Sequence, residues 1–511
     1  MKIPRTPVGG LLRRHSLLLF SFLTAALTLL ICSKSSPLYP MNDWVDVHCF
    51  LTLGKGLLNG MVPYVDLYEQ KGPVLYFIYA LVALFSQKSF FGQYLLEVIS
   101  FGLFLYFSGR IALLYLGKSR TVYPMISILG VLSACTRAFC HGGSVEQLCL
   151  FMFTYGLWTV LSASKQDRSL TATEALCNGI FAGCILWIKY SMLGFYIGLA
   201  VFVLIFYTFW LRDWRSLLRT MGSFLLGVVI VTVPVFLYFL ATGALDDLFT
   251  AYFYNNIFLY PDEDTTPLLE LIQTRLSRAW ELNPNIGGLL AIGLCYLLIR
   301  AKEAPRDLLA VCISFFGLAA TTFMGKSYYY YSMVFVSFTV LGMIPLVQTL
   351  RKLGITRVAA TLTRGAPLAR ILLQICAMVL CMSYGLTNSE NTYLMNYTRE
   401  QMPQYQFAQI MNERKEDPTM LNLGFLDGGF YYAADILPNT PFFCSFNVNA
   451  PGMWDDHWSV IREHKVDFII TRDTSLDRYY YGHDYELIST SEMIFEEVVF
   501  NYHLYALKEG V

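Results

Sequence analysis

Two carboxylates three residues apart, Asp43 and Asp46, precede a predicted helix with the pattern Phe-Leu-x-x-Gly-x-x-Leu-Leu. This spacing places both side chains near one face of the helix start, where a negative charge is favoured. A carboxylate in this position can take a proton from a hydroxyl group as a general base, or it can simply cap the helix. The residue types alone leave both interpretations open.

The same segment continues to Asp66 and Lys71, which follow Gly60 and Pro63. The glycine and the proline end the helix and turn the chain, so Asp66 can bind a ligand or merely complete a turn. Lys71 directly precedes an apolar run that opens with Gly-Pro. Its ammonium group can meet a phosphate or a lipid headgroup, and both alternatives stand.

A third candidate segment, 137–147, contains Arg137, His141 and Glu146 together with two adjacent glycines. Glycines allow the backbone to approach a ligand closely. Glu146 opens an apolar run, and a carboxylate at membrane depth is costly unless it is paired or functional. Arg137 and His141 are its candidate partners, and a helix-start carboxylate favoured by the dipole is the plain alternative.

The composition that surrounds these segments is that of a membrane protein. Of 511 residues, 55% are hydrophobic and 14% are charged, whereas soluble domains average roughly 25% charged residues. The 37 basic and 37 acidic side chains balance, which argues against nucleic acid as a partner. Most of the 12 cysteines lie in or beside apolar runs without metal-binding spacing, where cysteine acts as a small hydrophobe.

Eleven apolar runs have spanning or near-spanning length. They are residues 17–32, 93–116, 121–137, 145–163, 172–189, 192–211, 221–243, 286–300, 307–324, 328–349 and 370–387. Basic residues gather in alternate connections, whereas 34–72, 138–145, 244–285 and the tail after 388 are acidic or neutral. The positive-inside rule therefore predicts a mainly α, multi-pass helix bundle in the cell membrane, with a cytoplasmic N-terminus and those acidic or neutral segments outside.

Two segments do not fit a simple count of spans. The apolar run 73–87 is short, and treating it as a span would reverse every later loop, so we predict a helix lying at the outer interface. The long acidic segment 244–285 can close over a site or form a solvated face.

The residues after 388 differ in character from the rest. Short β-strands are predicted at 419–425 and 466–472, with a helix near 453–464. The chain therefore divides into a membrane domain, 1–388, with a first outer loop at 34–92, and a small extracytoplasmic α/β domain, 389–511.

The first outer loop carries a resemblance to a known family. An Asp before a helix is followed by Gly-x-x-Leu-Leu-Asn-Gly-x-x-Pro-Tyr-x-Asp-x-x-x-x-Lys-Gly-Pro, directly after the first span. This pattern resembles the bacterial GT-C glycosyltransferases, relatives of the protein O-mannosyltransferases and of the lipid A aminoarabinose transferase. The residue-level match is concentrated in 42–73, with a weaker echo at 141–147, and the resemblance in topology covers the full chain.

The resemblance implies an enzyme that moves a sugar from a polyprenyl-phosphate donor to an envelope glycan, lipid or protein, with inversion at the anomeric carbon. Asp46 is then the general base for the acceptor hydroxyl, with Asp43 as the second choice. A carboxylate suits this role because the hydroxyl must lose its proton as the sugar–phosphate bond breaks. Glu146 would contact the sugar or hold Asp46, while Asp66 and Lys71 are candidates for substrate binding.

Departure of a polyprenyl phosphate calls for cations on the outer face. Lys189 and Lys326 lie outside in the predicted topology, and Arg137 and His141 are further binding candidates. Relatives commonly carry His-Tyr where this chain has Tyr330-Tyr331, which puts a histidine role in doubt. An aromatic belt at the membrane interface is the plain alternative for the tyrosines.

No cofactor is required by these patterns. A divalent metal at Asp46, His48, His141 and Glu146 stays open, although no spacing demands one. The alternative function is a transporter or flippase of lipid-linked saccharides, but such proteins usually show internal repeats, and we see none. A non-catalytic scaffold is a third alternative, which the presence of the first-loop acids disfavours.

Overall fold

The computed structural model describes residues 15–86, 88–117, 120–260, 266–324, 326–355, 366–448, 450–476, 480–495 and 498–510. These residues form two compact units, each built from segments that are distant in sequence. The helical unit comprises 1–36, 94–231 and 265–392, and the sheet-bearing unit comprises 37–93, 232–264 and 393–511. The predicted division at residue 388 differs from this grouping, because the first outer loop clusters with the tail.

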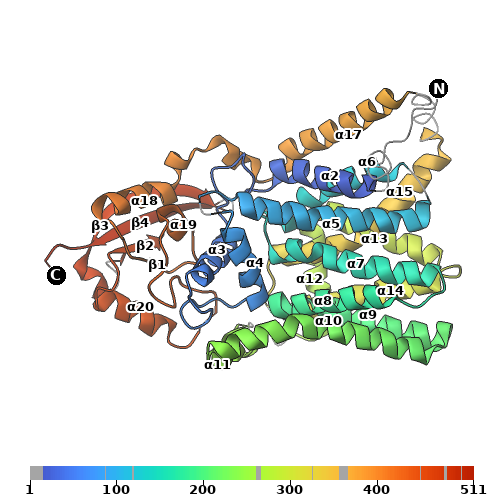
Figure 1. Cartoon of the computed structure of the whole chain (residues 1–511). Coiled ribbons are helices and arrows are strands. Elements are labelled where there is room, and N and C mark those ends of the chain that lie inside the picture. The colour runs from blue at the N-terminus through green and yellow to red at the C-terminus, as the bar shows by residue number, and fades with distance from the viewer. Residues whose placement is uncertain are drawn as a thin grey trace, which may run out of the picture. The chain divides into compact units, whose positions relative to one another are not determined.

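The helical unit follows the apolar runs of the sequence, and its longest helices run side by side (Figure 1). Its elements are α2 (Ser16–Cys32), α5 (Phe91–Leu116), α6 (Val122–Ala134), η1 (Arg137–Phe139), α7 (Val145–Lys165), α8 (Ala172–Lys189), η2 (Tyr190–Met192), α9 (Gly194–Ile205), η3 (Phe206–Leu211), α10 (Trp214–Ala241), α12 (Leu268–Leu282), α13 (Pro284–Ile299), α14 (Pro305–Thr322), η5 (Tyr329–Phe338), α15 (Val340–Lys352) and α17 (Pro367–Asn388). Three residues at the start of α5 and the last turns of α10 belong to the sheet-bearing unit.

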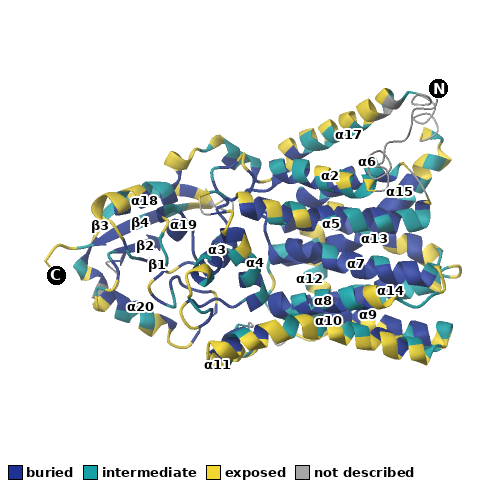
Figure 2. Ribbon diagram, viewed as in Figure 1, coloured by how far each residue is buried: buried dark blue, intermediate teal, exposed yellow. Residues whose placement is uncertain are grey.

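Six described helices are long and apolar enough to cross a membrane, or up to eight if each of two bent pairs counts as one span. The prediction of a membrane-embedded, mainly α bundle is confirmed, but the predicted number of eleven spans is not. All eleven apolar runs are helical, yet α2 and α6 are short, and α12 and α13 meet at 116°. Many residues of helix α10 are exposed, whereas those of α7 are mostly buried (Figure 2).

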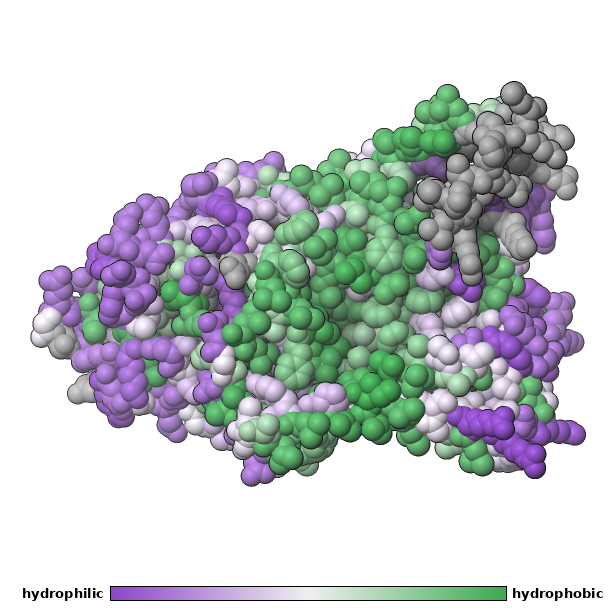
Figure 3. All heavy atoms as spheres, viewed as in Figure 1, coloured by the Kyte–Doolittle hydropathy of each residue, from purple (hydrophilic) through white to green (hydrophobic). Residues whose placement is uncertain are grey.

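The exposed side chains of the helical unit are apolar, as a lipid-facing surface requires. Leu218, Leu225 and Leu226 of α10 are each more than half exposed. Figure 3 shows a hydrophobic surface over these helices and a hydrophilic one around the strands of the sheet-bearing unit. A helix bundle surrounded by water would not expose so many large apolar side chains together, because large exposed apolar patches mark contact with a partner or a membrane.

Helices α8 and α10 approach each other at glycines, as the Gly-rich run near 221–227 predicts. A Cβ on Gly179 would lie 1.9 Å from the carbonyl oxygen of Phe224, and one on Gly227 would lie 2.3 Å from that of Leu176. Small residues permit such backbone contact between membrane helices.

The sheet-bearing unit joins the first loop to the tail. Its elements are α3 (Val45–Leu58), α4 (Pro73–Ala83), α11 (Leu245–Leu248), η4 (Phe249–Leu259), η6 (Thr392–Asn396), η7 (Arg399–Gln401), α18 (Pro403–Arg414), β1 (Met420–Leu423), α19 (Phe430–Ala434), α20 (Met453–Arg462), β2 (Phe468–Arg472), η9 (Tyr480–Asp484), β3 (Tyr485–Phe495) and β4 (Val498–Leu507). The strand order is β1-β2-β4-β3, with β1 parallel to β2 and the other pairs antiparallel.

The small α/β fold of the tail is therefore confirmed, with β1 and β2 at the two predicted strands and α20 at the predicted helix. The hairpin β3–β4 was not predicted from the sequence. Leu421, Ile469, Ile461 and Tyr505 belong to the core that packs α20 against the sheet. Burial of such side chains contributes most of the stability of a unit of this size.

Two helices of the first loop cross at a glycine. A Cβ on Gly54 of α3 would lie 2.5 Å from the carbonyl carbon of Tyr79 in α4. Helix α4 has 11 residues and leaves Leu81, Leu84 and Phe85, at or just after its end, more than half exposed. The short helix predicted at 73–87 is therefore present with an exposed apolar face, and its location at the outer interface stays a prediction.

Candidate active site

A buried ion pair joins two predicted residues of the helical unit. Lys189 Nζ lies 2.5 Å from Glu146 Oε1, and the Glu146 side chain is 1% exposed. Glu146 is in the first turn of α7, and Lys189 is the last residue of α8. Each charge therefore sits at the helix end whose dipole favours it.

The lysine of this pair also contacts a tyrosine of η5. Its Nζ lies 3.3 Å from the ring centroid of Tyr331, which is 5% exposed. A cation over an aromatic face is attracted by the ring quadrupole, most strongly when water is excluded. Ionised residues at membrane depth are rare and usually functional, so this pair is the centre of the candidate site.

Arg137, in η1, faces the same tyrosine segment. Its guanidinium carbon lies 5.2 Å from the ring centroid of Tyr329, and its Nη1 lies 2.9 Å from Glu390 Oε2. The Arg137 side chain is 27% exposed, so a ligand can reach it more easily than it can reach Lys189. We call Arg137, Glu146, Lys189, Tyr329 and Tyr331 the polar cluster.

The loop between η1 and α7 is fitted closely around buried polar groups. His141 is buried, and its carbonyl accepts the N–H of Lys34 at 2.9 Å. Gly142 has φ +88°, and a Cβ there would lie 3.0 Å from Glu97 Oε2. That oxygen also accepts a hydrogen bond from Gln147 Nε2 at 3.2 Å. The first of the two glycines is thus required by its backbone conformation and by the space available.

Lys34 and Glu97 are charged residues near the site that the sequence analysis missed. They are 1% and 0% exposed, respectively. Glu97 lies inside the apolar run 93–116, and an acid within a spanning run is the signal that could have singled it out. Lys34 resembled an ordinary polar exit from the first helix, and only its burial distinguishes it.

Two further predicted residues lie on or beside η5. The Tyr330 ring centroid is 5.1 Å from that of Tyr331, and the ring stacks on Tyr328 at 5.6 Å. Tyr330 is half-buried, as is Lys326 in the extended segment before η5. The structure therefore brings Arg137, Glu146, Lys189 and the tyrosines together, and it places Lys326 on the same segment.

The first-loop acids belong to the sheet-bearing unit and differ in exposure. Asp43 is 2% exposed, and the hydroxyl of Tyr393 lies 3.5 Å from its Oδ2. Asp46 is half-buried in the first turn of α3. The N-cap residue of this helix is Trp44, whose side chain makes no capping hydrogen bond, so neither acid occupies the N-cap position. Asp46 is the more open of the two carboxylates.

Buried polar contacts fix α3 in place. His48 Nε2 lies 2.6 Å from the carbonyl oxygen of Asn42, and Thr52 donates to Asp427 Oδ2 at 2.8 Å. Asp427 also accepts the N–H of Gly429 at 2.9 Å. Burial lowers the pKa of His48 and raises the pKa of Asp427. The hydrogen bond between Thr52 and Asp427 thus joins the helix that carries Asp46 to the tail. Burial disfavours the charged forms of both His48 and Asp427.

Asp66 and Lys71 occupy different surroundings in the same unit. Asp66 is exposed, and its Oδ2 accepts the N–H of Val62 at 2.7 Å, which is the turn interaction weighed from the sequence. Lys71 Nζ lies 3.8 Å from Oε1 of buried Glu69 and 5.8 Å from the ring centroid of Phe50. Lys71 is therefore held against α3, while Asp66 shapes the loop.

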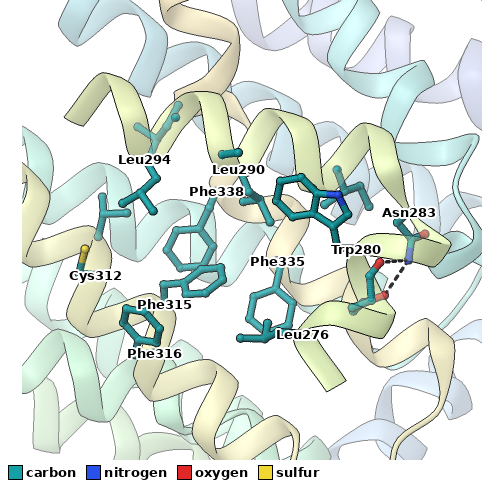
Figure 4. A pocket seen from close by; sticks show the side chains of 18 residues that line it. Leu276, Trp280, Asn283, Leu290, Leu294, Cys312, Phe315, Phe316, Phe335 and Phe338 are labelled. Carbon is teal, nitrogen blue, oxygen red and sulfur yellow. Dashed lines mark hydrogen bonds between the residues drawn. The ribbon is translucent and has the colours of Figure 1, made fainter. Parts of the chain in front are cut away.

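An apolar cavity of about 280 Å³ opens in the helical unit between α12, α13, α14 and η5. Figure 4 shows Trp280, Phe315, Phe316, Phe335 and Phe338 around it. Among its lining residues, Asn283 and Ser332 carry polar side chains at one place on the wall. Such a cavity suits an apolar chain with a polar group at one end.

Comparison with known proteins places this arrangement in a fold family. No family model and no curated protein sequence matches the chain. Among solved structures, ArnT from Cupriavidus metallidurans bound to undecaprenyl phosphate is similar, with a TM-score of 0.60 and 14% identity over 94% of this chain and 97% of that one. Its apo state gives a TM-score of 0.58 and 12% identity over the same shares. The apo oligosaccharyltransferase of Archaeoglobus fulgidus gives 0.50 and 14% identity over 92% of this chain and 71% of that one.

The chain has the GT-C fold. The fold predicted from the first loop is thereby confirmed, since the likeness extends over most of the chain. At these identities the likeness is one of fold, and the chemistry must be argued from the residues of this chain.

Two of the residues considered for a metal, His48 and Glu146, have other partners in the structure. No three His, Cys, Asp or Glu side chains in the described part of the chain are grouped to hold a metal ion. His48 directs Nε2 at a backbone carbonyl, and Glu146 is paired with Lys189. We therefore derive no step through a metal.

Proposed function

We propose that this protein is a membrane glycosyltransferase that moves a sugar from a polyprenyl-phosphate donor to an envelope acceptor on the outer face of the membrane. The observation that carries the proposal is that, within a GT-C fold, η5 lines the apolar cavity with Ser332 and Phe335 and lends Tyr329 and Tyr331 to the polar cluster. Segment η5 thus borders both the apolar cavity, which can hold an apolar chain, and the polar cluster, which can bind an anionic headgroup. Undecaprenyl phosphate bound to ArnT supports this class of donor.

The two cations of the polar cluster have different parts in this proposal. Arg137 is partly exposed and presents a planar set of donors that suits a phosphate. Lys189 is neutralised by Glu146 and fixed over Tyr331, so it sets the local field and holds the segment in place. Arg137 stabilises the charge that gathers on the leaving phosphate, and Tyr330 lies beside Tyr329 and Tyr331. Lys326 and His141 are proposed to take part in binding the same group.

Asp46 is the proposed general base, with Asp43 as the second choice. The acceptor hydroxyl gives its proton to the carboxylate while its oxygen bonds to the anomeric carbon. The bond between that carbon and the phosphate oxygen breaks on the opposite face, and the electron pair leaves with the polyprenyl phosphate. This single displacement inverts the anomeric centre. The half-buried position of Asp46 favours it over buried Asp43.

The remaining predicted residues complete the proposal. Lys71 and Asp66 shape the first loop beside the acceptor, and Glu146 holds Lys189 rather than meeting the sugar itself. The N-terminus is proposed to be cytoplasmic and the sheet-bearing unit extracytoplasmic, because the basic loops lie on one side by sequence.

The test is sugar transfer by purified protein with a panel of undecaprenyl-phosphate sugars and membrane extract as acceptor. Asp46→Asn should lower the turnover by about 10²- to 10⁴-fold, the usual contribution of a general base, while thermal stability stays near that of the wild type. Asp455→Asn is the matched control, since it removes an exposed acid from the first turn of another helix in the same unit.

Three outcomes separate the alternatives. Loss of turnover in Asp46→Asn alone supports Asp46 as base, whereas loss only in Asp43→Asn moves the role to Asp43. If the wild type transfers no sugar but moves lipid-linked sugar across vesicle membranes, the protein is a flippase and the proposed transferase activity is wrong.

A further inference from the structure

Asn283 lies buried at the break between two helices of the helical unit. Helices α12 and α13 meet there at 116°, and the residue is 2% exposed. Pro284 begins α13, and a residue before proline avoids the helical conformation, so the sequence Asn-Pro explains the elbow. A broken helix in an apolar setting leaves backbone groups that need other partners.

The side chain of Asn283 bonds to three separate elements. Its Oδ1 accepts the N–H of Ala138 in η1 at 2.8 Å. Its Nδ2 donates to the carbonyl of Ala279 in α12 at 3.0 Å and to Ser332 Oγ in η5 at 3.3 Å. Figure 4 shows this group on the wall of the apolar cavity.

Two of the residues that bond to Asn283 directly follow members of the polar cluster in the sequence. Ala138 directly follows Arg137, and Ser332 directly follows Tyr331, the ring that covers Lys189. Four lining residues of the cavity come from η5 or the start of the next helix, and three more come from α12. A ligand that fills the cavity therefore contacts α12 and η5. Asn283 is hydrogen-bonded to both of these elements and to η1.

We propose that Asn283 is a positioning residue that couples occupancy of the apolar cavity by a prenyl chain to the order of η1 and η5, and hence to the placement of Arg137 and Tyr331. The coupling rests on the proposed function, from which it takes the ligand class. Donors with a long chain are then positioned for reaction, whereas donors whose chain leaves the cavity empty are not. Asn283 touches no reacting atom.

Amide hydrogen exchange of the purified protein tests the coupling without any sugar transfer. The probes are undecaprenyl phosphate, geranyl phosphate and inorganic phosphate, each added alone. In the wild type, undecaprenyl phosphate should slow exchange in 137–141 and 329–333 by about ten-fold or more, which corresponds to about 1.4 kcal/mol of ligand-dependent ordering. Geranyl phosphate should slow exchange in these segments only weakly, and inorganic phosphate should not slow it.

Asn283→Ala should still bind undecaprenyl phosphate, as a thermal shift reports, but lose most of this protection. Because that variant can fail to fold, Ser332→Ala provides a second one. It removes the contact with Asn283 Nδ2 and the hydrogen bond that Ser332 donates to the carbonyl of Tyr329 at 2.6 Å, and it should reduce the protection in η5. The matched control is Asn178→Ala. Asn178 is also buried and donates to a carbonyl four residues earlier and to a hydroxyl, at Glu174 and Thr159, but it does not line the cavity.

Three results contradict the proposal in distinguishable ways. Binding with unchanged protection in Asn283→Ala and Ser332→Ala overturns the coupling and leaves the donor class intact. Absence of undecaprenyl phosphate binding by the wild type overturns the coupling together with the proposed donor. Equal loss of protection in Asn178→Ala shows a general loss of rigidity, and it also contradicts a specific role for Asn283.

Discussion

Two buried acids, Glu146 in the helical unit and Asp427 in the sheet-bearing unit, are stabilised in different ways. In the helical unit, buried Glu146 is matched by an opposite charge on Lys189. In the sheet-bearing unit, buried Asp427 is matched by a hydroxyl and a backbone N–H, and His48 by a backbone carbonyl. Burial raises the pKa of Asp427 and lowers the pKa of His48.

The difference follows from the backbone available near each group. At the start of α7, Ser144 Oγ already accepts the N–H of Gln147, and the buried carboxylate of Glu146 takes its partner from another helix. Loops and helix starts in the sheet-bearing unit leave free N–H and C=O groups that can satisfy a buried side chain. Removing one member of an ion pair should therefore cost more than removing one hydrogen-bonded group.

The largest expected effect comes from breaking the Glu146–Lys189 pair. Lys189→Met leaves Glu146 buried without its counter-charge and should lower the free energy of unfolding by about 3–5 kcal/mol, whereas Glu146→Gln with Lys189→Met should cost much less. Denaturation in detergent measures both. A double variant that is no more stable than Lys189→Met would show that the pair is not coupled.

A second buried ion pair, formed by Lys165 of α7 and Asp307 of α14, provides the control for activity. Lys165 Nζ lies 3.0 Å from Asp307 Oδ2, which is also buried, and Lys165 and Glu146 are about 30 Å apart along α7. Lys165→Met should destabilise the protein comparably but leave sugar transfer by the folded fraction unchanged. Transfer that falls equally in both lysine variants would contradict a special role for the polar cluster.

A smaller effect is expected where the first loop packs on itself. Gly54→Ala places a Cβ 2.5 Å from the backbone of Tyr79, which neither helix can avoid without moving, so the free energy of unfolding should fall by about 1–3 kcal/mol. Gly222→Ala in α10, where a Cβ meets nothing within 4 Å, should instead be neutral or stabilising. Similar stabilities for the two variants, measured by thermal unfolding, would refute the close contact.

The smallest expected effect is a dependence of stability on pH in the sheet-bearing unit. Burial lowers the pKa values of His48 and His457, so the unfolded chain binds more protons, and stability should fall as pH drops below about 6.5. Asp427, whose pKa burial raises, acts in the opposite sense as pH rises above about 4.

His457→Gln isolates the histidine contribution. Its amide can still donate to the carbonyl of Phe442, which lies 2.8 Å from His457 Nε2, but it does not titrate. The unfolding midpoint of the variant should fall less than that of the wild type between about pH 7 and 5.5. An unchanged slope would mean that His457 titrates normally in the folded protein.

Much of the fold could be predicted because apolar length and charge asymmetry are local features of the sequence. The runs that became α5, α7, α8 and α10 are visible in this way. The hairpin β3–β4 was missed, because its strands carry polar and charged residues and gain their partners only on pairing. The elbow at Asn283 was missed because its surroundings resembled an acidic loop.

For the candidate site, the sequence identified candidate residues by their type, but it did not show which of them pair with each other. Glu146 and Lys189 stood out as ionised residues at the ends of apolar runs, but they are 43 positions apart, and no local pattern relates them. The sequence by itself determined a membrane helix bundle of the GT-C type with acids in its first loop. Only the tertiary structure decided that Lys189 is paired, that Lys34 and Glu97 are buried, and that Asn283 links the cavity to η1 and η5. The reason is physical: burial and pairing depend on which helices meet, and contacts between distant segments set that.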